Sequence, residues 1–317
     1  MFDKFREECG VVGVYGHPEA ANMVYLGLYA LQHRGQESAG IVSSDSQVLI
    51  SHRQMGLVAD IFKEDVIKNL KGSSAIGHNR YSTTGQSHLK NAQPFVVEYA
   101  DGPIAVAHNG NLVNAQSLRA ELEAYGSIFQ STSDTEVLIH LIATSRERTL
   151  MGRLVDSLSR ASGAYSLVFL TLDRMIAARD PRGFRPLVVG KFHTASNGDG
   201  YVVASETCVL DLIEAEYLRE VEPGEIVTFG PEGMESLKPF PPMSHAKCIF
   251  EYIYFSRPDS NIYGRNVYQI RKELGRQLAR ESGVEADIVT PVPDSGGSGS
   301  LGLFRGVRTS YGLWTHP

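Results

Sequence analysis

The sequence contains little cysteine and no long hydrophobic run. Its 317 residues include three cysteines, Cys9, Cys208 and Cys248, which are far apart and odd in number. A disulfide framework is therefore not expected, and a reducing cytoplasm is the predicted location. No apolar stretch approaches the roughly 20 residues that span a membrane, so no membrane partner is expected. The first eight residues carry charges of both signs and no apolar segment, which argues against a signal peptide.

Basic residues are not in excess either. The chain has 30 Lys and Arg against 36 Asp and Glu, a formal net charge of −6, and the basic residues are spread along it. Proteins that bind nucleic acid usually carry a basic patch or stripe, so nucleic acid is not an expected partner. A locally positive pocket for an anionic substrate remains compatible with this balance. Hydrophobic residues make up 42%, and the length allows two ordinary globular domains.

Hydrophobic patterns predict a run of strands, then helices, then strands again. This order favours an α+β fold with two sheets between helix layers over a βαβ alternation. Ser133 and Glu136 are expected to form a capping box at the start of the second of three central helices. The predicted strands are 9–15, 41–42, 48–51, 75–81, 95–99, 104–108, 165–171, 175–178, 187–189, 201–204 and 226–229, and the predicted helices are 19–31, 114–124, 135–146 and 150–159.

The composition changes near residue 238. Residues 238–244 contain three prolines and are predicted to be a linker. A helix at 267–282 and a strand at 287–292 follow, which is how a βαβ-type unit begins. Residues 296–317 have Gly, Ser and Arg without any period and are not expected to continue the regular pattern.

Four short polar segments accompany Cys9, which is followed by glycine at a predicted strand. They are 32–40, 77–85, 108–111 and 133–136, with the sequences QHRGQESAG, GHNRYSTTG, HNGN and SDTE. A lone cysteine is more often an inert buried thiol. Taken together and in order, however, the segments from Cys9 to about Gly230 resemble the class II glutamine amidotransferases of the N-terminal-nucleophile hydrolase superfamily. The resemblance implies an αββα sandwich of two antiparallel sheets, with residues 1–8 as a propeptide and 9–237 as the amidotransferase domain.

The resemblance also implies a mechanism. Amide hydrolysis needs a nucleophile, a base, an oxyanion site and a grip on the substrate. Cleavage before Cys9 would free an α-amine with a pKa of about 7.7–8.0, which can accept the thiol proton, so no catalytic histidine is required. The Asn109 side chain and the Gly110 N–H are implied as oxyanion donors.

Substrate contacts follow from the same resemblance. Arg80 is implied to bind the α-carboxylate of glutamine and Asp134 its α-ammonium group, while Arg34 and Gly35 are implied to lie beside Cys9. Each has a structural alternative: Arg80 as a surface ion-pair partner, Asp134 as helix-start charge, and the Asn-Gly pair as a simple turn. No role is assigned to His33 or His78.

The second part of the chain indicates which family of class II amidotransferases the sequence resembles. Residues 248–260, CIFEYIYFSRPDS, and 292–295, VPDS, resemble the amidophosphoribosyltransferase family. Members convert glutamine and phosphoribosyl pyrophosphate to phosphoribosylamine, glutamate and pyrophosphate in purine biosynthesis, and ammonia passes inside the protein. The resemblance implies Mg²⁺ associated with Ser295 and, in some members, a [4Fe–4S] cluster for which Cys248 is one thiolate ligand. It also implies purine nucleotides as inhibitors and a homo-oligomer.

The chain departs from this family near its end. The resemblance is expected to stop at about Ser295, which makes 238–295 a linker and an incomplete type I phosphoribosyltransferase domain. No Asp-Asp pair occurs anywhere. Codons for residues 303–310, LFRGVRTS, can read YSEASGLP one base over, so a frameshift is hypothesised and 296–317 is interpreted as an aberrant tail.

Two consequences and two alternatives follow. One helix and one strand cannot bury a core, so residues after about 260 are expected to be poorly stabilised. The chain is expected to hydrolyse glutamine weakly at best and to make no phosphoribosylamine. The alternatives are another class II enzyme, of the glucosamine-6-phosphate or asparagine synthetase type, and a non-catalytic fragment.

Overall fold

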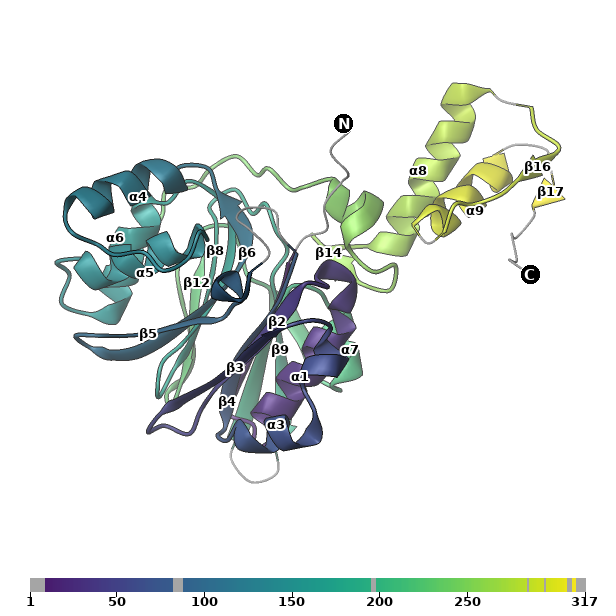
Figure 1. The fold of residues 1–317 in the computed structure, drawn as a ribbon. Helices are drawn as coiled ribbons and strands as arrows, with labels where there is room; N and C mark the ends of the chain where they lie inside the picture. The colour runs from purple at the N-terminus through teal and green to yellow at the C-terminus, as the bar shows by residue number, and fades with distance from the viewer. Residues whose placement is uncertain are drawn as a thin grey trace. The chain divides into compact units, whose positions relative to one another are not determined.

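The computed structural model describes residues 9–81, 88–194, 198–283, 285–293, 295–306 and 310–311. The chain divides into two compact units between Lys247 and Cys248 (Figure 1). The predicted propeptide, residues 1–8, lies outside the described residues. So do Asp294, the end of the polar segment 77–85 and most of the last eleven residues.

The first unit contains two antiparallel sheets. The seven-stranded sheet has the order β11-β9-β10-β1-β4-β2-β3, and the six-stranded sheet has the order β13-β12-β8-β7-β6-β5. The strands of the first sheet are β1 (Gly10–Tyr15), β2 (Ser38–Ser44), β3 (Leu49–Met55), β4 (Ser74–Arg80), β9 (Val188–Thr194), β10 (Gly198–Ala204) and β11 (Glu216–Glu220). Those of the second are β5 (Phe95–Tyr99), β6 (Gly102–Leu112), β7 (Gly163–Leu170), β8 (Met175–Arg179), β12 (Ile226–Gly230) and β13 (Gly233–Leu237).

Helices cover the outer face of each sheet (Figure 1). The first sheet packs against α1 (Ala20–Ala30), α2 (Val58–Ile61), α3 (Glu64–Asn69) and α7 (Cys208–Leu212). The second packs against α5 (Thr135–Thr144) and α6 (Leu150–Arg160), and α4 (Ala115–Ala124) packs on α5. A third apolar core fills the space between the sheets. The predicted αββα sandwich is therefore confirmed.

Strand alternation decides which side chains face the space between the sheets. On β1, Val11 belongs to the inter-sheet core whereas Val12 and Val14 pack outward. On β4 and β6 the inter-sheet residues include Ile76 and Ala107. Successive side chains on a strand point to opposite faces, so residues two positions apart share a face. By this spacing Cys9, Arg80 and Asn109 lie on the same inner face as Val11, Ile76 and Ala107. The strand ends therefore bring three of the predicted site residues to the inter-sheet side.

Several local expectations need correction. The strand pattern missed β11 and β13, and the capping box is wrong. The Ser133 hydroxyl accepts from Thr135 N at 3.3 Å, but the Glu136 carboxylate accepts from Gln130 N and Ser131 N, each at 2.7 Å. The preceding loop brings these donors to Glu136, so its side chain secures that loop and does not reach back to Ser133.

The second unit begins with a π-helical turn, η3 (Glu251–Phe255), and a short hairpin of β14 (Asn261–Ile262) and β15 (Arg265–Asn266). Helix α8 (Val267–Ser282) has the predicted bounds. The Asn266 side chain caps it by accepting from Gln269 N at 3.2 Å, and Gly283 ends it with φ of 56°. Strand β16 (Ile288–Val289) pairs in parallel with β17 (Ser310–Tyr311).

Helix α9 (Gly296–Gly306) was not expected, because its glycines and serines gave no helical period. Glycine explains both the missing signal and the packing. A Cβ on Gly275 of α8 would lie 1.9 Å from Gly299 O, and one on Gly302 would lie 2.0 Å from Lys272 O. The two backbones touch, so this region holds a second helix where the sequence predicted only one helix and one strand.

Candidate active site

Cys9 directly precedes β1, and its side chain is buried. The thiol donates to Tyr81 O at 3.5 Å, and its own carbonyl oxygen accepts from Arg34 Nε at 3.1 Å. Gly10 pairs with Asn79 of β4, so the end of β4 lies beside Cys9. The local contacts therefore hold both the backbone and the sulfur of the predicted nucleophile.

Arg34 ends a 3₁₀ turn, η1 (Gln32–Arg34), and is fully buried. Its Nη1 donates to Glu206 Oε1 at 2.7 Å, and His33 Nε2 lies 2.9 Å from the same oxygen. Burial alone would raise the pKa of Glu206. The hydrogen bond and charge from His33, together with Arg34, outweigh burial and lower the pKa of Glu206 to about 2. Sequence reasoning missed Glu206, a lone acid after a strand.

Gly35 allows the loop after Arg34 to approach the end of β4. A Cβ on Gly35 would lie 2.7 Å from Arg80 N, and Glu37 N donates to Arg80 O at 3.1 Å. The Arg80 guanidinium is 3.8 Å from the Glu37 carboxylate, and its side chain is only 4% exposed. Arg80 is therefore a buried residue at the predicted site, and the alternative of a surface ion pair is wrong.

Asn109 is tied to the first sheet through Ser205. Ser205 Oγ accepts from Val11 N at 3.0 Å and lies 3.5 Å from Asn109 Nδ2. The Asn109 Oδ1 atom is buried and has no hydrogen-bond partner among the described residues. This contact joins the end of β6 to the start of β1 next to Cys9.

Gly110 requires glycine for two reasons. Its φ of 153° lies in the region that side chains disfavour, and a Cβ there would lie 2.1 Å from Ala164 O. Asn109 and Gly110 pair with Ser166 and Tyr165 inside the β6–β7 ladder. The alternative that Asn109 and Gly110 form a simple turn is therefore wrong.

Asp134 lies at the start of α5 and connects it to β6. Its Oδ2 accepts from Leu112 N at 2.8 Å, and its Oδ1 lies 3.8 Å from His108 Nδ1. Leu112 is two residues beyond Gly110 on the same strand. The carboxylate is thus positioned by strand contacts as well as by the helix start.

His78 bridges the two sheets. Its Nε2 lies 3.1 Å from His108 O, and it is fully buried. Burial, reinforced by the charges of Arg80 and His108, lowers the pKa of His78 to about 3. A histidine that is neutral at physiological pH suits this buried position.

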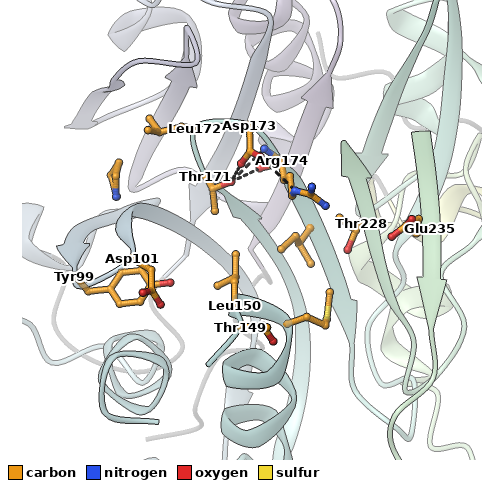
Figure 2. Close-up of a pocket in the computed structure, with 13 residues that line it drawn as sticks. Tyr99, Asp101, Thr149, Leu150, Thr171, Leu172, Asp173, Arg174, Thr228 and Glu235 are labelled. Carbon is orange, nitrogen blue, oxygen red and sulfur yellow. Dashed lines mark hydrogen bonds and ion pairs between the residues drawn. The ribbon is translucent and has the colours of Figure 1, made fainter. Parts of the chain in front are cut away.

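A cavity of about 610 Å³ lies at the other end of β6 (Figure 2). Tyr99 at the end of β5 and Asp101 in the β5–β6 turn line it, together with Thr171, Asp173 and Arg174 of the β7–β8 turn, which bond to one another. None of the predicted site residues lines it. This cavity is therefore separate from the predicted glutamine site.

In the part of the chain that the structure describes, no set of metal ligands gathers at the residues expected at metal centres. Cys248 is a free thiol in the second unit, and no group of three or more His, Cys, Asp or Glu residues there could hold an ion. Ser295 lines a cavity of about 430 Å³ that has no carboxylate among its lining residues. We therefore derive no reaction step through Mg²⁺ or an iron–sulfur cluster.

No described helix is both long enough and apolar enough to cross a lipid bilayer. A glutamine amidotransferase domain model matches residues 78–211. The chain is 55% identical over 313 residues to a chloroplastic amidophosphoribosyltransferase of Glycine max, covering 98% of this chain and 54% of that protein. It is 50% identical over 308 residues to the amidophosphoribosyltransferase of Bacillus subtilis (strain 168), covering 97% of this chain and 64% of that protein.

Two solved structures are similar over 96% of this chain and 65% of theirs. One, described as the allosteric regulatory enzyme of purine biosynthesis, has a TM-score of 0.92 and 50% identity. The other is the B. subtilis glutamine phosphoribosylpyrophosphate amidotransferase with ADP and GMP, with a TM-score of 0.89 and 48% identity. The chain thus spans between half and two thirds of these relatives. Matches to 98% of this chain extend past Ser295, where the resemblance was expected to stop.

Proposed function

This chain belongs to the amidophosphoribosyltransferase family, and we propose that residues 9–237 hydrolyse glutamine with Cys9 as the nucleophile. The observation that supports this best is the meeting of strand ends from both sheets. Cys9 precedes β1, Arg80 ends β4, and Asn109 is linked to β1 through Ser205. A nucleophile, a cation that can bind the substrate and an amide donor are three of the groups that hydrolysis of glutamine requires, and the α-amine of Cys9 is proposed as the base.

The proposed reaction starts from a mature chain that begins at Cys9. Its α-amine takes the thiol proton, and the thiolate attacks the carboxamide carbon of glutamine. The Asn109 amide and Gly110 N–H donate to the oxyanion. Ammonia leaves with the transferred proton, and water then hydrolyses the thioester to glutamate and frees the thiol.

Arg80 and Asp134 are proposed to orient the substrate. A guanidinium pairs with the planar α-carboxylate of glutamine, and a carboxylate pairs with its α-ammonium group. Both side chains are already secured: Arg80 near Glu37 and Asp134 by Leu112 N. In this proposal Arg34 and Gly35 lie beside Cys9, and Arg34 binds the Cys9 carbonyl oxygen.

The activity of the whole protein is proposed from its relatives. In that proposal, ammonia passes to phosphoribosyl pyrophosphate to give phosphoribosylamine and pyrophosphate in purine biosynthesis. In the same proposal residues 1–8 are a propeptide and 238–295 a linker and part of a phosphoribosyltransferase domain. We do not propose that 296–317 is an aberrant tail, because the matches to relatives extend past Ser295. Mg²⁺, a cluster at Cys248, a homo-oligomer and a cytoplasmic location stay predictions. Inhibition by purine nucleotides is supported by the ADP and GMP bound to the B. subtilis enzyme.

The glutaminase proposal is tested by glutamate release during long incubation with glutamine. Wild type is expected to release glutamate, and Cys9→Ala is expected to release none. Cys248→Ser is the control, because Cys248 is a cysteine of the second unit, outside the proposed glutaminase domain. Glutamate release by folded Cys9→Ala at the wild-type rate would contradict the proposal.

A further inference from the structure

The segment after β10 runs alongside the predicted nucleophile. The β1–β10 ladder ends at the pair Val12–Ala204, and Ser205 then bonds Val11 in both directions, through its N–H and its hydroxyl. Glu206 is the next residue. The pairing of β10 with β1 therefore places the Glu206 carboxylate near Cys9, although the two residues are almost 200 positions apart in the sequence.

Glu206 is a buried carboxylate that forms an ion pair with Arg34 and also contacts His33. Its side chain is fully buried, and so is that of Arg34, whose Nη1 lies 2.7 Å from Glu206 Oε1. His33 Nε2 approaches the same oxygen to 2.9 Å. Taking ionised groups out of water is costly, so an ion pair of this kind is weak evidence for stability alone and suggests a positional role.

Arg34 connects this carboxylate to the nucleophile. While Nη1 binds Glu206, Nε donates to the carbonyl oxygen of Cys9 at 3.1 Å. The rigid, planar guanidinium fixes these two bonds relative to each other, which a lysine ammonium cannot do. Holding the carbonyl oxygen fixes rotation about the Cα–C bond of Cys9, and hence the directions of its α-amine and its Cα–Cβ bond, which carries the thiol.

We propose that Glu206 is a positioning residue for the nucleophile and acts through Arg34. The inference deepens the proposed function and rests on it. Glu206 orients the guanidinium, the guanidinium holds the Cys9 carbonyl, and the thiol and α-amine of Cys9 are thereby aligned for attack on glutamine. Misplacement of a reacting group by about 1 Å can cost on the order of 100-fold in rate.

The test measures alkylation of Cys9 by a chloroketone analogue of glutamine. The thiolate displaces chloride to form a thioether, which intact-mass and peptide mass spectrometry locate and count. For the 317-residue protein, Glu206→Gln is expected to lower the limiting labelling rate about 10- to 100-fold. The half-saturating concentration should change less than about threefold, because the proposed substrate contacts at Arg80 and Asp134 are intact.

Glu225→Gln is the matched control. Glu225 is also buried in the first unit, and both of its oxygens are 2.8 Å from Arg219. It should lower the melting temperature without slowing labelling of Cys9. If Glu206→Gln does not fold, Arg34→Lys takes its place, since lysine keeps the charge but cannot span Glu206 and the Cys9 carbonyl.

The outcomes separate the two proposals. Wild-type protein that is not labelled at Cys9 contradicts the glutaminase proposal itself. Wild-type labelling together with an equal limiting rate in the folded variant overturns the role of Glu206. A slowed limiting rate in Glu206→Gln, with Glu225→Gln unaffected, supports it.

Discussion

The amide nitrogen of Asn109 lies 3.5 Å from the hydroxyl oxygen of Ser205, so one contact links the second sheet to the first at the predicted oxyanion site. Ser205→Ala removes it and also leaves the buried Val11 N–H without its side-chain acceptor, at a cost of about 1–3 kcal/mol. Glutamate release should fall about tenfold because the oxyanion donor is less well fixed. Thermal unfolding and steady-state kinetics measure both effects.

Ser43→Ala is the control for that variant. Ser43 is buried too, but within the described part of the chain its hydroxyl has no hydrogen-bond partner. Its removal should leave stability and kinetics nearly unchanged. Equal behaviour of the two alanine variants would argue against the bridging role of Ser205.

Gly110→Ala is expected to reduce both stability and glutamate release. The new Cβ would lie 2.1 Å from Ala164 O, so β6 must shift and move the Asn109 amide and the Gly110 N–H. Gly102→Ala is the comparison: it has φ of 105° on the same strand, with nothing within 4 Å of the Cβ. Gly102→Ala should lower stability by about 1–2 kcal/mol, because its positive φ disfavours a side chain, and should leave glutamate release unchanged. Normal kinetics in Gly110→Ala would refute the oxyanion assignment.

Asp134→Asn is expected to raise KM for glutamine about 10- to 100-fold, because a hydrogen bond to a charged group contributes about 1.5–3 kcal/mol. The amide oxygen can still accept from Leu112 N, so the fold should persist. Asp156→Asn, an exposed change on α6, should leave KM unchanged. An unchanged KM in Asp134→Asn would mean that Asp134 does not bind the substrate ammonium group.

The low pKa of Glu206 predicts an acid-dependent stability difference. The folded pKa is about 2, against an ordinary value of 4.5, so the ionised group stabilises the fold above about pH 4.5 and this contribution is lost as the pH falls towards 2. The melting temperature of wild type should exceed that of Glu206→Gln most at neutral pH, and the two should converge below pH 4.5. A constant difference from pH 7 to 2.5 would contradict this.

The 317-residue chain expressed on its own is expected to release no pyrophosphate from phosphoribosyl pyrophosphate. A phosphoribosyltransferase site needs paired acidic residues to hold magnesium, and the sequence has no Asp-Asp pair. A coupled pyrophosphate assay with ammonium as the nitrogen source tests this step without the glutaminase. Substrate-dependent pyrophosphate release would show that the chain is sufficient for transfer.

Local signals in the sequence predicted much of the fold. Helix α8 was predicted with its true bounds, and the structure has an asparagine cap and a left-handed glycine at its two ends. Strand β11 gave no such signal, since its Glu216, Arg219 and Glu220 leave no apolar alternation on an edge strand. Helix α9 was missed because its glycines serve contact with α8 and not an apolar stripe.

The sequence predicted the site residues that lie in short local motifs and missed Glu206. Cys9, Arg80 and Asn109 belong to short motifs that can be recognised along the chain. Glu206 acquires its role only when β10 pairs with β1 and brings it to Arg34, 172 positions away. Pairing between distant strands produces no local sequence pattern. The Arg34–Glu206 ion pair could therefore be recognised only from the folded structure.

The most direct test of the central claim is the mass of the mature N-terminus, measured on protein that also turns over glutamine. The proposed mechanism needs the α-amine of Cys9 as the base, so active protein should begin at Cys9, with residues 1–8 removed. Cys9→Ala, which removes the nucleophile, should leave no glutaminase activity. Active protein that retains Met1 in stoichiometric amounts would contradict the mechanism.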